Sequence, residues 1–290
     1  MKFENVRVFN FEGAFRGMRN PHNSWDKSLS HFGIEHIEAF DDTARDIATE
    51  WLQASRINML DPDYDALHTN VTNNIEEQAI IHEDKNYIEF AALCPDDLNL
   101  AYKLITAGPE HRKFMRQIMV TVDITAPLYW WKEFDTYKVG TVSNSTSTMH
   151  TLTHHPIAID SFEMGDFNNI QFPLEAQRPD LKYNIDEDFV QMCLIPYLEY
   201  LRQTYCDLME HEKFDEGKIV WKELIRWLPE SFLQKRTITM NYENLYEMCL
   251  PTQRRHHKLT EWSQDFMQFA HNLPYADVLL FGDETATTSR

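Results

Sequence analysis

The amino-acid sequence predicts an α+β protein in which a small, mainly antiparallel sheet is flanked by long helices. Apolar and polar residues alternate along 117–124, which is typical of a half-buried strand. Apolar residues recur every three or four positions along 95–107 and again along the last helix, which begins near Leu259. Long helical patterns dominate the second half of the chain. Together these patterns predict one interlocked domain spanning residues 1–290.

The expected domain has a divergent N-terminal part, 1–95, a core of helix, strand, helix and loop, 96–150, and a helical part, 184–275. In the N-terminal part, residues 6–11 and 87–93 have strand-like patterns. A further segment of this part, 42–55, is predicted to be a helix because four apolar residues share one face, namely Ala44, Ile47, Ala48 and Trp51.

Two other N-terminal segments, 14–30 and 61–72, are predicted to be loops. The first contains Gly17 and Pro21 and carries two basic residues, Arg16 and Arg19.

The core begins with the clearest helix of the sequence, 95–107. Pro95 suits the first helical position, and Asp96 and Asp97 suit the positive end of the helix dipole. Gly108 and Pro109 then end the helix. After the strand at 117–124, residues 127–136 are predicted to form a short aromatic helix.

The helical part is predicted to contain a long helix at 186–212, which Pro196 kinks or breaks. An amphipathic helix follows at 218–228. Residues 237–240 suit a short strand, and Asn241 suits the N-cap of the next helix. The last helix carries a buried stripe that consists of Leu259, Trp262, Phe266, Phe269 and Leu273.

Composition restricts the classes of partner. The chain of 290 residues has a formal net charge of −19, which argues against broad binding to nucleic acids or anionic membranes. A few local arginines can still hold a small anionic ligand. The four cysteines form no CxxC pair, and the sequence has neither an apolar signal segment nor a run of 18 apolar residues. We therefore expect a cytoplasmic protein without a membrane span.

Histidines and carboxylates cluster at three places, which are His154-His155, His256-His257 and Glu210-His211-Glu212. Adjacent residues on a helix point about 100° apart, so such pairs rarely chelate one ion. No HExxH pattern occurs. We therefore predict no metal site.

Two segments invite a binding interpretation. The aromatic stretch at 128–134 is followed at 141–150 by a run rich in serine and threonine. This run is either a plain exposed loop or a loop whose hydroxyl and N–H groups hold a polar ligand. Arg254 and Arg255 precede the last helix, where an anion site and a solvated basic turn are both possible.

The order of these pieces resembles the flavin-dependent thymidylate synthase (ThyX) family. That family's signature is Arg-His-Arg, seven residues, and then Ser. Aligned from Ala126-Pro127, it falls on Thr136-Tyr137-Lys138, seven residues, and Thr146. The family's upstream histidine falls on His111, and its downstream Leu-Pro and Asn fall on Leu228-Pro229 and Asn241.

The resemblance implies reductive methylation of dUMP to dTMP with FAD as cofactor and with methylenetetrahydrofolate and NADPH as co-substrates. It also implies a homotetramer whose sites are shared between subunits. The implied catalytic residues are Thr146 and Arg255. The implied cofactor-binding residues are His111, Thr136, Tyr137, Lys138 and Asn241. The implied substrate-binding residues are Glu133, Asn144, Ser147, Thr148 and Arg254.

The signature is substituted at several positions. Of the three residues that replace Arg-His-Arg, only Lys138 keeps a positive charge, and Thr148 replaces an arginine that binds the nucleotide phosphate in the family. Arg16 or Arg19 could replace that arginine. The alternatives to dTMP synthesis are a flavoenzyme of the same fold that acts on another pyrimidine nucleotide, and an inactive oligomeric binding protein.

Overall fold

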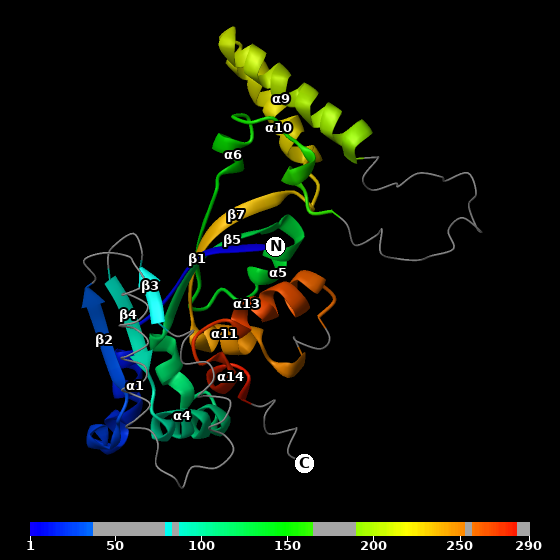
Figure 1. The fold of residues 1–290 in the computed structure, drawn as a ribbon. Helices are drawn as coiled ribbons and strands as arrows, with labels where there is room; N and C mark the ends of the chain where they lie inside the picture. The colour runs from blue at the N-terminus through cyan, green and yellow to red at the C-terminus, as the bar shows by residue number, and fades with distance from the viewer. Residues whose placement is uncertain (37–78, 83–86, 165–189, 253–256, 283–290) are drawn as a thin grey trace, which may run out of the picture. The chain divides into compact units, whose positions relative to one another are not determined.

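The computed structural model describes residues 1–36, 79–82, 87–164, 190–252 and 257–282 (Figure 1). The helix expected at 42–55 and the loop expected at 61–72 lie outside these residues. The chain folds into two compact units. Unit 1 consists of Met1–Lys2, Asp123–Thr136 and Ser143–Thr237. Unit 2 consists of Phe3–Val122, Tyr137–Val142 and Ile238–Arg290. The expectation of one interlocked domain stays a prediction.

Four strands form the first sheet, in the order β1-β5-β7-β6. Their bounds are Lys2–Phe9 for β1, Met119–Pro127 for β5, Leu233–Asn241 for β7 and Val142–Ser145 for β6. The strand predicted at 117–124 is confirmed as β5, and the short strand predicted at 237–240 is the end of the longer β7. Along β5, buried and half-exposed residues alternate, as the sequence pattern predicts.

Strands β5 and β7 run antiparallel. The N–H of Tyr242 donates to the carbonyl of Ile118 at 3.0 Å beside one end of the pair. The N–H of Leu128 donates to the carbonyl of Phe232 at 3.1 Å beside the other end. The start of one strand therefore lies beside the end of the other, which is the antiparallel arrangement.

The second sheet has the order β2-β4-β3, with bounds His31–His36, Tyr87–Ala92 and Ala79–His82. Both pairs are antiparallel. This sheet contains the strand predicted at 87–93. Tyr275 contacts the end of β4, because its hydroxyl donates to Ala91 O at 2.7 Å and accepts from the N–H of Leu93 at 2.9 Å. Burial raises the pKa of this hydroxyl, so it stays protonated and able to donate.

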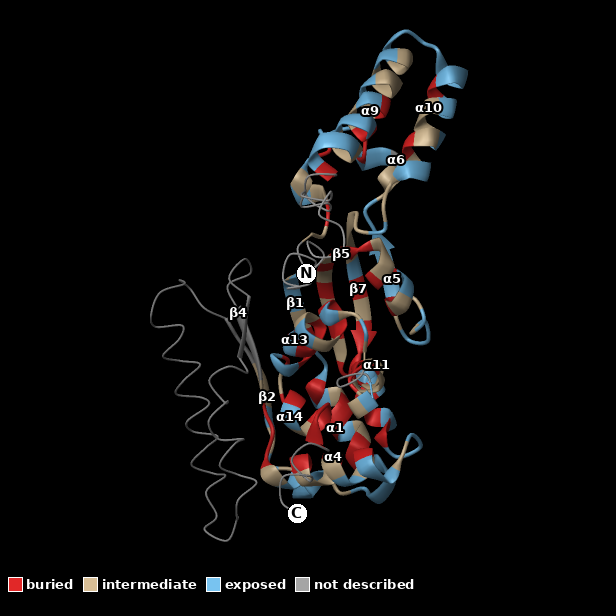
Figure 2. Cartoon of the chain, turned by 90° about the vertical axis from the view of Figure 1, so that its right-hand side faces the viewer, coloured by how far each residue is buried: buried red, intermediate tan, exposed pale blue. Residues whose placement is uncertain are grey.

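Helix α1, Phe11–Arg19, corrects the prediction of a loop at 14–30. Its buried face contains Phe11, Ala14, Phe15 and Met18, at the spacing of a helix. Figure 2 shows buried residues, coloured red, along α1. A Cβ at Gly13 would lie 2.3 Å from the side-chain oxygen of Asn10, so the Asn10 side chain would have to move. Two short 3₁₀ helices follow, at Asn20–His22 and Trp25–Lys27.

Helix α4, Pro95–Ala107, confirms the clearest helix prediction. Asp97 does more than complement the helix dipole, since it is fully buried. Its carboxylate accepts from Arg19 Nε at 2.5 Å, from Ser28 Oγ at 2.5 Å and from Ser30 Oγ. This buried network connects the start of α4 to the segment that follows α1.

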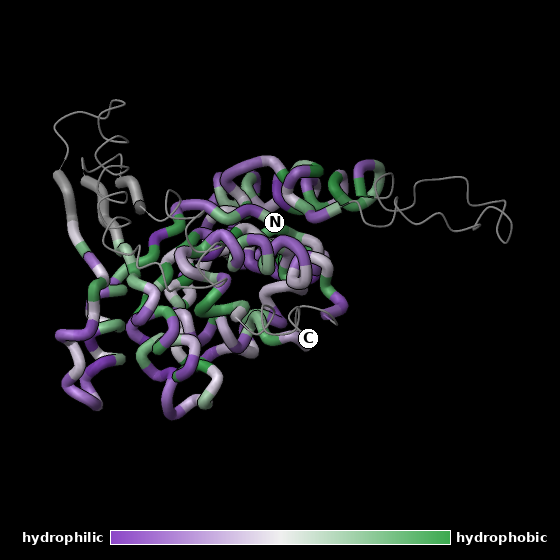
Figure 3. The backbone as a smooth tube through the Cα atoms, turned by 60° about the horizontal axis from the view of Figure 1, so that its bottom comes forward, coloured by the Kyte–Doolittle hydropathy of each residue, from purple (hydrophilic) through white to green (hydrophobic). Residues whose placement is uncertain are grey.

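The remaining helices of unit 2 carry its core. They are η5 (Arg112–Gln117), α11 (Tyr242–Met248), η9 (Glu261–Phe266), α13 (Met267–His271) and α14 (Ala276–Leu279). Trp262, Phe266, Phe269 and Leu273 are all buried, which confirms most of the predicted stripe of the last helix. Hydrophobic and hydrophilic residues alternate along the helices of the chain, as Figure 3 shows.

Unit 1 contains α5 (Leu128–Phe134), α6 (Thr148–Thr151), α9 (Ile195–Glu210) and α10 (Phe214–Trp227). Pro196 is the second residue of α9, and it cannot donate a backbone hydrogen bond to the helical turn before it. A π-helical turn, Val190–Leu194, precedes it. The core of this part includes Leu198, Leu201 and Leu224. None of the described helices is long and apolar enough to cross a membrane.

Candidate functional site

The aromatic residues of α5 pack in the core just before the expected site residues at 136–148. Trp130 and Trp131 are fully buried, and Phe134 stacks on Trp130 with ring centroids 5.2 Å apart. The indole N–H of Trp131 donates to the carbonyls of Ala126 and Gln234 at 3.1 and 3.0 Å. These rings are therefore occupied in packing, and the residues available to a ligand come later in the chain.

In unit 2, an aromatic stack forms around Trp262. The ring of Tyr137 lies 5.4 Å from the Trp262 ring at an interplanar angle of 26°, and the ring of His257 lies 5.0 Å from it at 15°. Trp262 is itself fully buried, and its indole N–H donates to Met248 O at 3.3 Å. Tyr137 is half-buried. Flat, partly accessible rings of this kind suit stacking on a planar ligand.

The side chain of His257 has a fixed orientation. Its Nδ1 accepts from the backbone N–H of Leu259 at 3.2 Å. In the neutral ring the proton therefore belongs to Nε2, which is then a donor.

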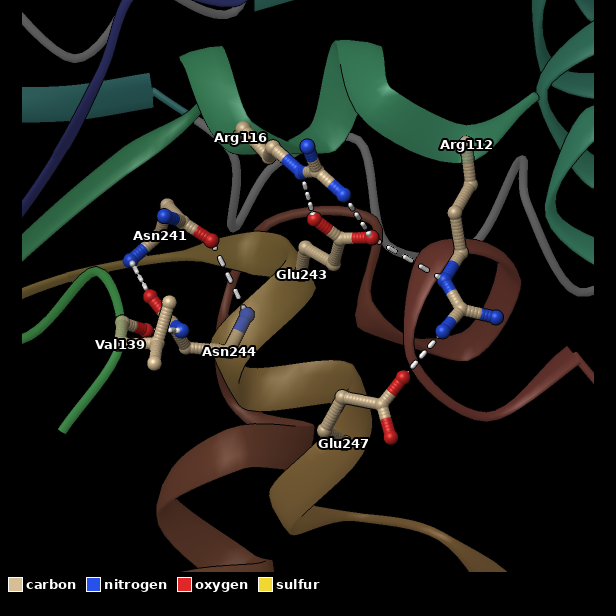
Figure 4. A network of polar contacts seen from close by, with 7 residues as sticks. All are labelled: Arg112, Arg116, Val139, Asn241, Glu243, Asn244 and Glu247. Atoms are coloured by element: carbon tan, nitrogen blue, oxygen red, sulfur yellow. Dashed lines mark hydrogen bonds and ion pairs between the residues drawn. The ribbon is translucent and has the colours of Figure 1, made fainter. Parts of the chain in front are cut away.

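Two asparagines at the start of α11, the N-cap Asn241 and Asn244, lie against the segment that carries Tyr137 and Lys138. Asn241 caps the helix, since its Oδ1 accepts from the N–H of Asn244 at 3.0 Å, which confirms the predicted N-cap. Asn244 Oδ1 accepts in return from the N–H of Asn241 at 3.2 Å. The amide of Asn244 also donates to the carbonyl of Val139 at 2.6 Å, as Figure 4 shows.

Three of the five residues expected to bind the cofactor lie in this part of unit 2. Tyr137 and Lys138 are consecutive, and Asn241 lies against Gly140, where a Cβ would come within 3.1 Å of Asn241 Nδ2. Lys138 is exposed. His111 is also exposed and immediately precedes η5. The structure therefore brings Asn241 together with the Tyr137–Gly140 segment.

The arginines of η5 are engaged by acidic residues of α11 (Figure 4). Arg116 donates twice to the carboxylate of Glu243, the longer contact being 3.2 Å. Arg112 pairs with Glu247 and lies 3.4 Å from Glu243. The pKa of Arg116 is raised, first by its hydrogen bond to Glu243 and then by the charge of that carboxylate. These ion pairs fix α11 against η5.

In unit 1, Thr146 is held by strand β7. Its N–H and its hydroxyl both donate to the carbonyl of Lys235, at 2.9 and 3.1 Å. Its own carbonyl accepts from Gln234 Nε2 at 3.3 Å. The hydroxyl proton of Thr146 is thus committed to the protein, and the hydroxyl oxygen remains able to accept a hydrogen bond.

The run at 141–150 is not the plain loop that its composition suggests. Strand β6 includes the exposed Asn144, and α6 begins at Thr148. The carbonyl of Ser147 accepts from the hydroxyl of Thr151 at 2.9 Å. Thr136 and Glu133 lie at the end of α5, and the N–H of Thr136 donates to the carbonyl of Glu133 at 3.0 Å. The expected substrate residues of unit 1 thus lie on three short elements.

Arg236 of β7 was not identified from the sequence, although it contacts the aromatic helix that precedes this run and the residue that bonds Thr146. Its guanidinium lies 4.3 Å above the Trp131 ring. It donates to Asp135 Oδ1 at 3.0 Å and to Gln234 Oε1 at 2.9 Å. Asp135 precedes Thr136, and Gln234 contacts Thr146, so β7 holds the chain at Asp135 and at Thr146 within unit 1.

The other arginines considered for phosphate binding are Arg16, Arg19, Arg254 and Arg255. Arg254 and Arg255 lie outside the described residues. Arg19 is buried against Asp97 and also donates to the carbonyl of Ser24 at 3.2 Å, so it cannot replace a phosphate-binding arginine. Arg16 is exposed on α1. The ion pair of Arg19 could not be predicted from local sequence patterns, because its partner lies in another helix.

Among the residues that the structure describes, no three His, Cys, Asp or Glu side chains are grouped so that they could hold a metal ion. None of the four cysteines, all of which lie in the described residues, forms a disulfide. His154 and His155 are exposed. His211 lies at the end of α9, where its Nδ1 bonds the carbonyl of Asp207 at 2.7 Å.

No protein-family model matches this chain, and the search of curated proteins found no match. Among solved structures, the chain is similar to two of the flavin-dependent thymidylate synthase ThyX from Helicobacter pylori, each with FAD and dUMP. One is 19% identical with a TM-score of 0.41, and the match covers 65% of this chain and 83% of that chain. The other is 15% identical with a TM-score of 0.42, and the match covers 87% and 98%. This likeness concerns the arrangement of the chain alone, and both structures come from the family that the sequence resembles.

Proposed function

We propose that this chain is a flavin-dependent enzyme of the thymidylate synthase type, which methylates dUMP reductively to dTMP. Its one-carbon donor is methylenetetrahydrofolate, and NADPH is the reductant. The observation that carries the proposal is the segment Tyr137–Gly140, onto which part of the family's signature falls in the sequence. It combines a stacked aromatic ring, an exposed cation and a backbone held by Asn244.

These residues fit a flavin by their chemistry. The Tyr137 ring, supported by the buried Trp262, offers a flat apolar face to an isoalloxazine. Lys138 offers a positive charge to a pyrophosphate. When bound, FAD supplies the hydride transfer that amino-acid side chains cannot perform. The role of the protein is to bind and orient the flavin ring and to balance its charge.

We propose that the residues of unit 1 bind the nucleotide. Asn144 and Ser147 present polar side chains, and Thr146 presents a hydroxyl oxygen that can still accept a hydrogen bond from the N–H of a pyrimidine. Arg254 and Arg255 are proposed to pair with phosphate, as the resemblance implies. The same resemblance leads us to propose a homotetramer, and the scattered cysteines lead us to propose a cytoplasmic location.

A second candidate is a flavoenzyme of the same fold that acts on another pyrimidine nucleotide. The observation in its favour is Thr148, which stands where the family has a phosphate-binding arginine. Losing such a buried contact without replacement costs about 2–4 kcal/mol. That corresponds to roughly 30–1000-fold in affinity. Arg19 cannot compensate because it is committed to Asp97.

The experiment that tests the proposal is a titration of purified protein with FAD, followed by assay of tritium release from C5-labelled dUMP with NADPH and methylenetetrahydrofolate. The proposal predicts flavin uptake and tritium release. Flavin uptake with no release from dUMP, but with release from another labelled pyrimidine nucleotide, favours the second candidate. A protein that takes up no FAD contradicts both.

A further inference from the structure

We infer that Asn244 is a positioning residue for the segment Tyr137–Gly140, which the proposed function assigns to FAD. The inference rests on that function only for its flavin readout. Asn244 uses both ends of its side-chain amide. Its Oδ1 completes the cap of α11 at the N–H of Asn241, and its Nδ2 donates to the carbonyl of Val139 at 2.6 Å (Figure 4).

The geometry of Gly140 supports the same contact independently. Gly140 has a φ of +84°, which side chains rarely adopt. A Cβ there would lie 2.9 Å from Asn244 Oδ1 and 3.1 Å from Asn244 Nδ2. The absence of a side chain therefore lets Asn244 approach the backbone of the segment closely.

Ion pairs on both sides of Asn244 fix the backbone of α11 around it. Glu243 precedes it and receives both contacts of Arg116, and Glu247 lies one turn later and pairs with Arg112. Charge-assisted pairs of this kind are stronger than neutral hydrogen bonds. The first turn of α11 is thus fixed to η5. The hydrogen bond from Asn244 to Val139 then holds the Tyr137–Gly140 segment against this fixed helix.

A second hydrogen bond closes the segment on itself. The hydroxyl of Thr141 donates to the carbonyl of Tyr137 at 2.7 Å. Tyr137 is further held by its stacking on Trp262. Lys138 has no ion pair among the described contacts of the segment, so the position of its backbone depends on the anchors at Tyr137 and Val139. Asn244 therefore sets where Lys138 emerges without touching the ligand.

The deciding variant is Asn244→Asp. A carboxylate keeps an acceptor for the N–H of Asn241 and suits the positive end of a helix, so α11 still forms. It loses the donor to Val139 and places a negative oxygen against that carbonyl. Asn272→Asp, at an exposed position after α13, adds the same charge in unit 2 and serves as the matched control.

Two readouts are measured on the full chain. Hydrogen exchange of the amides at 137–142 needs no flavin, and Asn244→Asp is expected to speed it about five-fold or more, while Asn272→Asp leaves it unchanged. The Kd for FAD is expected to rise about ten-fold, which is about 1.4 kcal/mol. Turnover at saturating FAD is expected to stay within about two-fold of wild type, because Asn244 does not touch the reacting atoms.

Gly140→Ala tests the same contact from the other side, because its Cβ must push Asn244 away. It is expected to change both readouts in the same direction. Unchanged hydrogen exchange at 137–142 in both variants overturns the inference, whatever the Kd for FAD. Faster exchange in a protein that binds no FAD supports the positioning role of Asn244 and overturns the proposed function instead.

Discussion

The rings of Tyr137 and Trp262 stack with their centroids 5.4 Å apart and their planes 26° from parallel. Trp262 has no exposed surface, whereas Tyr137 is half-buried. A buried indole thus supports a partly accessible phenol ring next to an exposed lysine. This pair is the structural basis for assigning a planar cofactor to unit 2.

The first prediction concerns the ring of Tyr137. Tyr137→Ala removes the stacking face and is expected to weaken FAD binding about ten-fold, since an aromatic pair contributes about 0.5–1.5 kcal/mol beyond its buried area. Tyr137→Phe keeps the face and should bind FAD within about two-fold of wild type. Quenching of flavin fluorescence on titration measures both. Equal affinities for the Ala and Phe variants would remove Tyr137 from the site.

The second prediction concerns the charge of Lys138. Lys138→Ala is expected to weaken FAD retention about ten-fold through loss of a charge-assisted contact, and Lys138→Arg should restore most of it. Lys103→Ala, on the exposed face of α4, is the control for net charge. Flavin occupancy after gel filtration is the measurement. If Lys138→Ala and Lys103→Ala retain the same amount of flavin, Lys138 has no specific role.

The third prediction concerns the hydroxyl of Thr146. Thr146→Ala is expected to lower affinity for dUMP about five-fold, while Thr146→Ser stays close to wild type. The lost bond to Lys235 is exposed, so unfolding free energy should fall by under about 1 kcal/mol. Calorimetric titration with dUMP, together with thermal unfolding, separates the two effects. Wild-type nucleotide affinity in the Ala variant would exclude Thr146 from the site.

The fourth prediction concerns the buried pair of Asp97 and Arg19. Asp97→Ala leaves the guanidinium of Arg19 buried without its carboxylate, which should cost about 3–5 kcal/mol of unfolding free energy. Replacing both residues together, as Arg19→Met with Asp97→Leu, should restore much of that loss. Urea unfolding of the three proteins provides the measurement. A loss under about 1 kcal/mol in Asp97→Ala would mean that Arg19 finds another partner.

The fifth prediction concerns pH and Glu199 of unit 1. Burial raises the pKa of this carboxyl, but hydrogen bonds from Arg202 and from the N–H of Ile157 outweigh it, and the pKa is lowered. A folded pKa below the unfolded one stabilises the fold above the unfolded value of about 4.3. That contribution is lost as pH falls from there through the folded pKa.

Glu199→Gln should therefore remove part of the fall in unfolding free energy that wild type shows below about pH 4.3. Glu210→Gln, at an exposed position near the end of the same helix, is the control. Unfolding curves at several pH values give the comparison. A pH dependence in Glu199→Gln that equals wild type would show that this carboxyl is not a source of acid sensitivity.

Local signals predicted much of the fold. Helix α4 and the cap at Asn241 were predictable because their signals lie within a few residues in the sequence. Helix α1 was missed because Gly13 and Gly17 resemble loop residues. Gly13 in fact lies against the side chain of Asn10, a contact that only the folded chain reveals.

The candidate site was predictable only in part. Family resemblance pointed to Tyr137 and Lys138, but the support of Tyr137 by Trp262 depends on tertiary packing between distant segments. The roles of Arg236 and Arg112 likewise depend on partners far away in the sequence. Asn244 could have been found, because a capping residue followed three positions later by a second polar side chain is a local pattern.

The most direct test of the central claim is the FAD titration of purified wild-type protein beside Tyr137→Ala and Tyr137→Phe, read by the shift of the flavin absorption bands. We expect saturable uptake by the wild type and the Phe variant, with much weaker uptake by the Ala variant. A wild-type protein that leaves the flavin spectrum unchanged at saturating concentrations would contradict the claim.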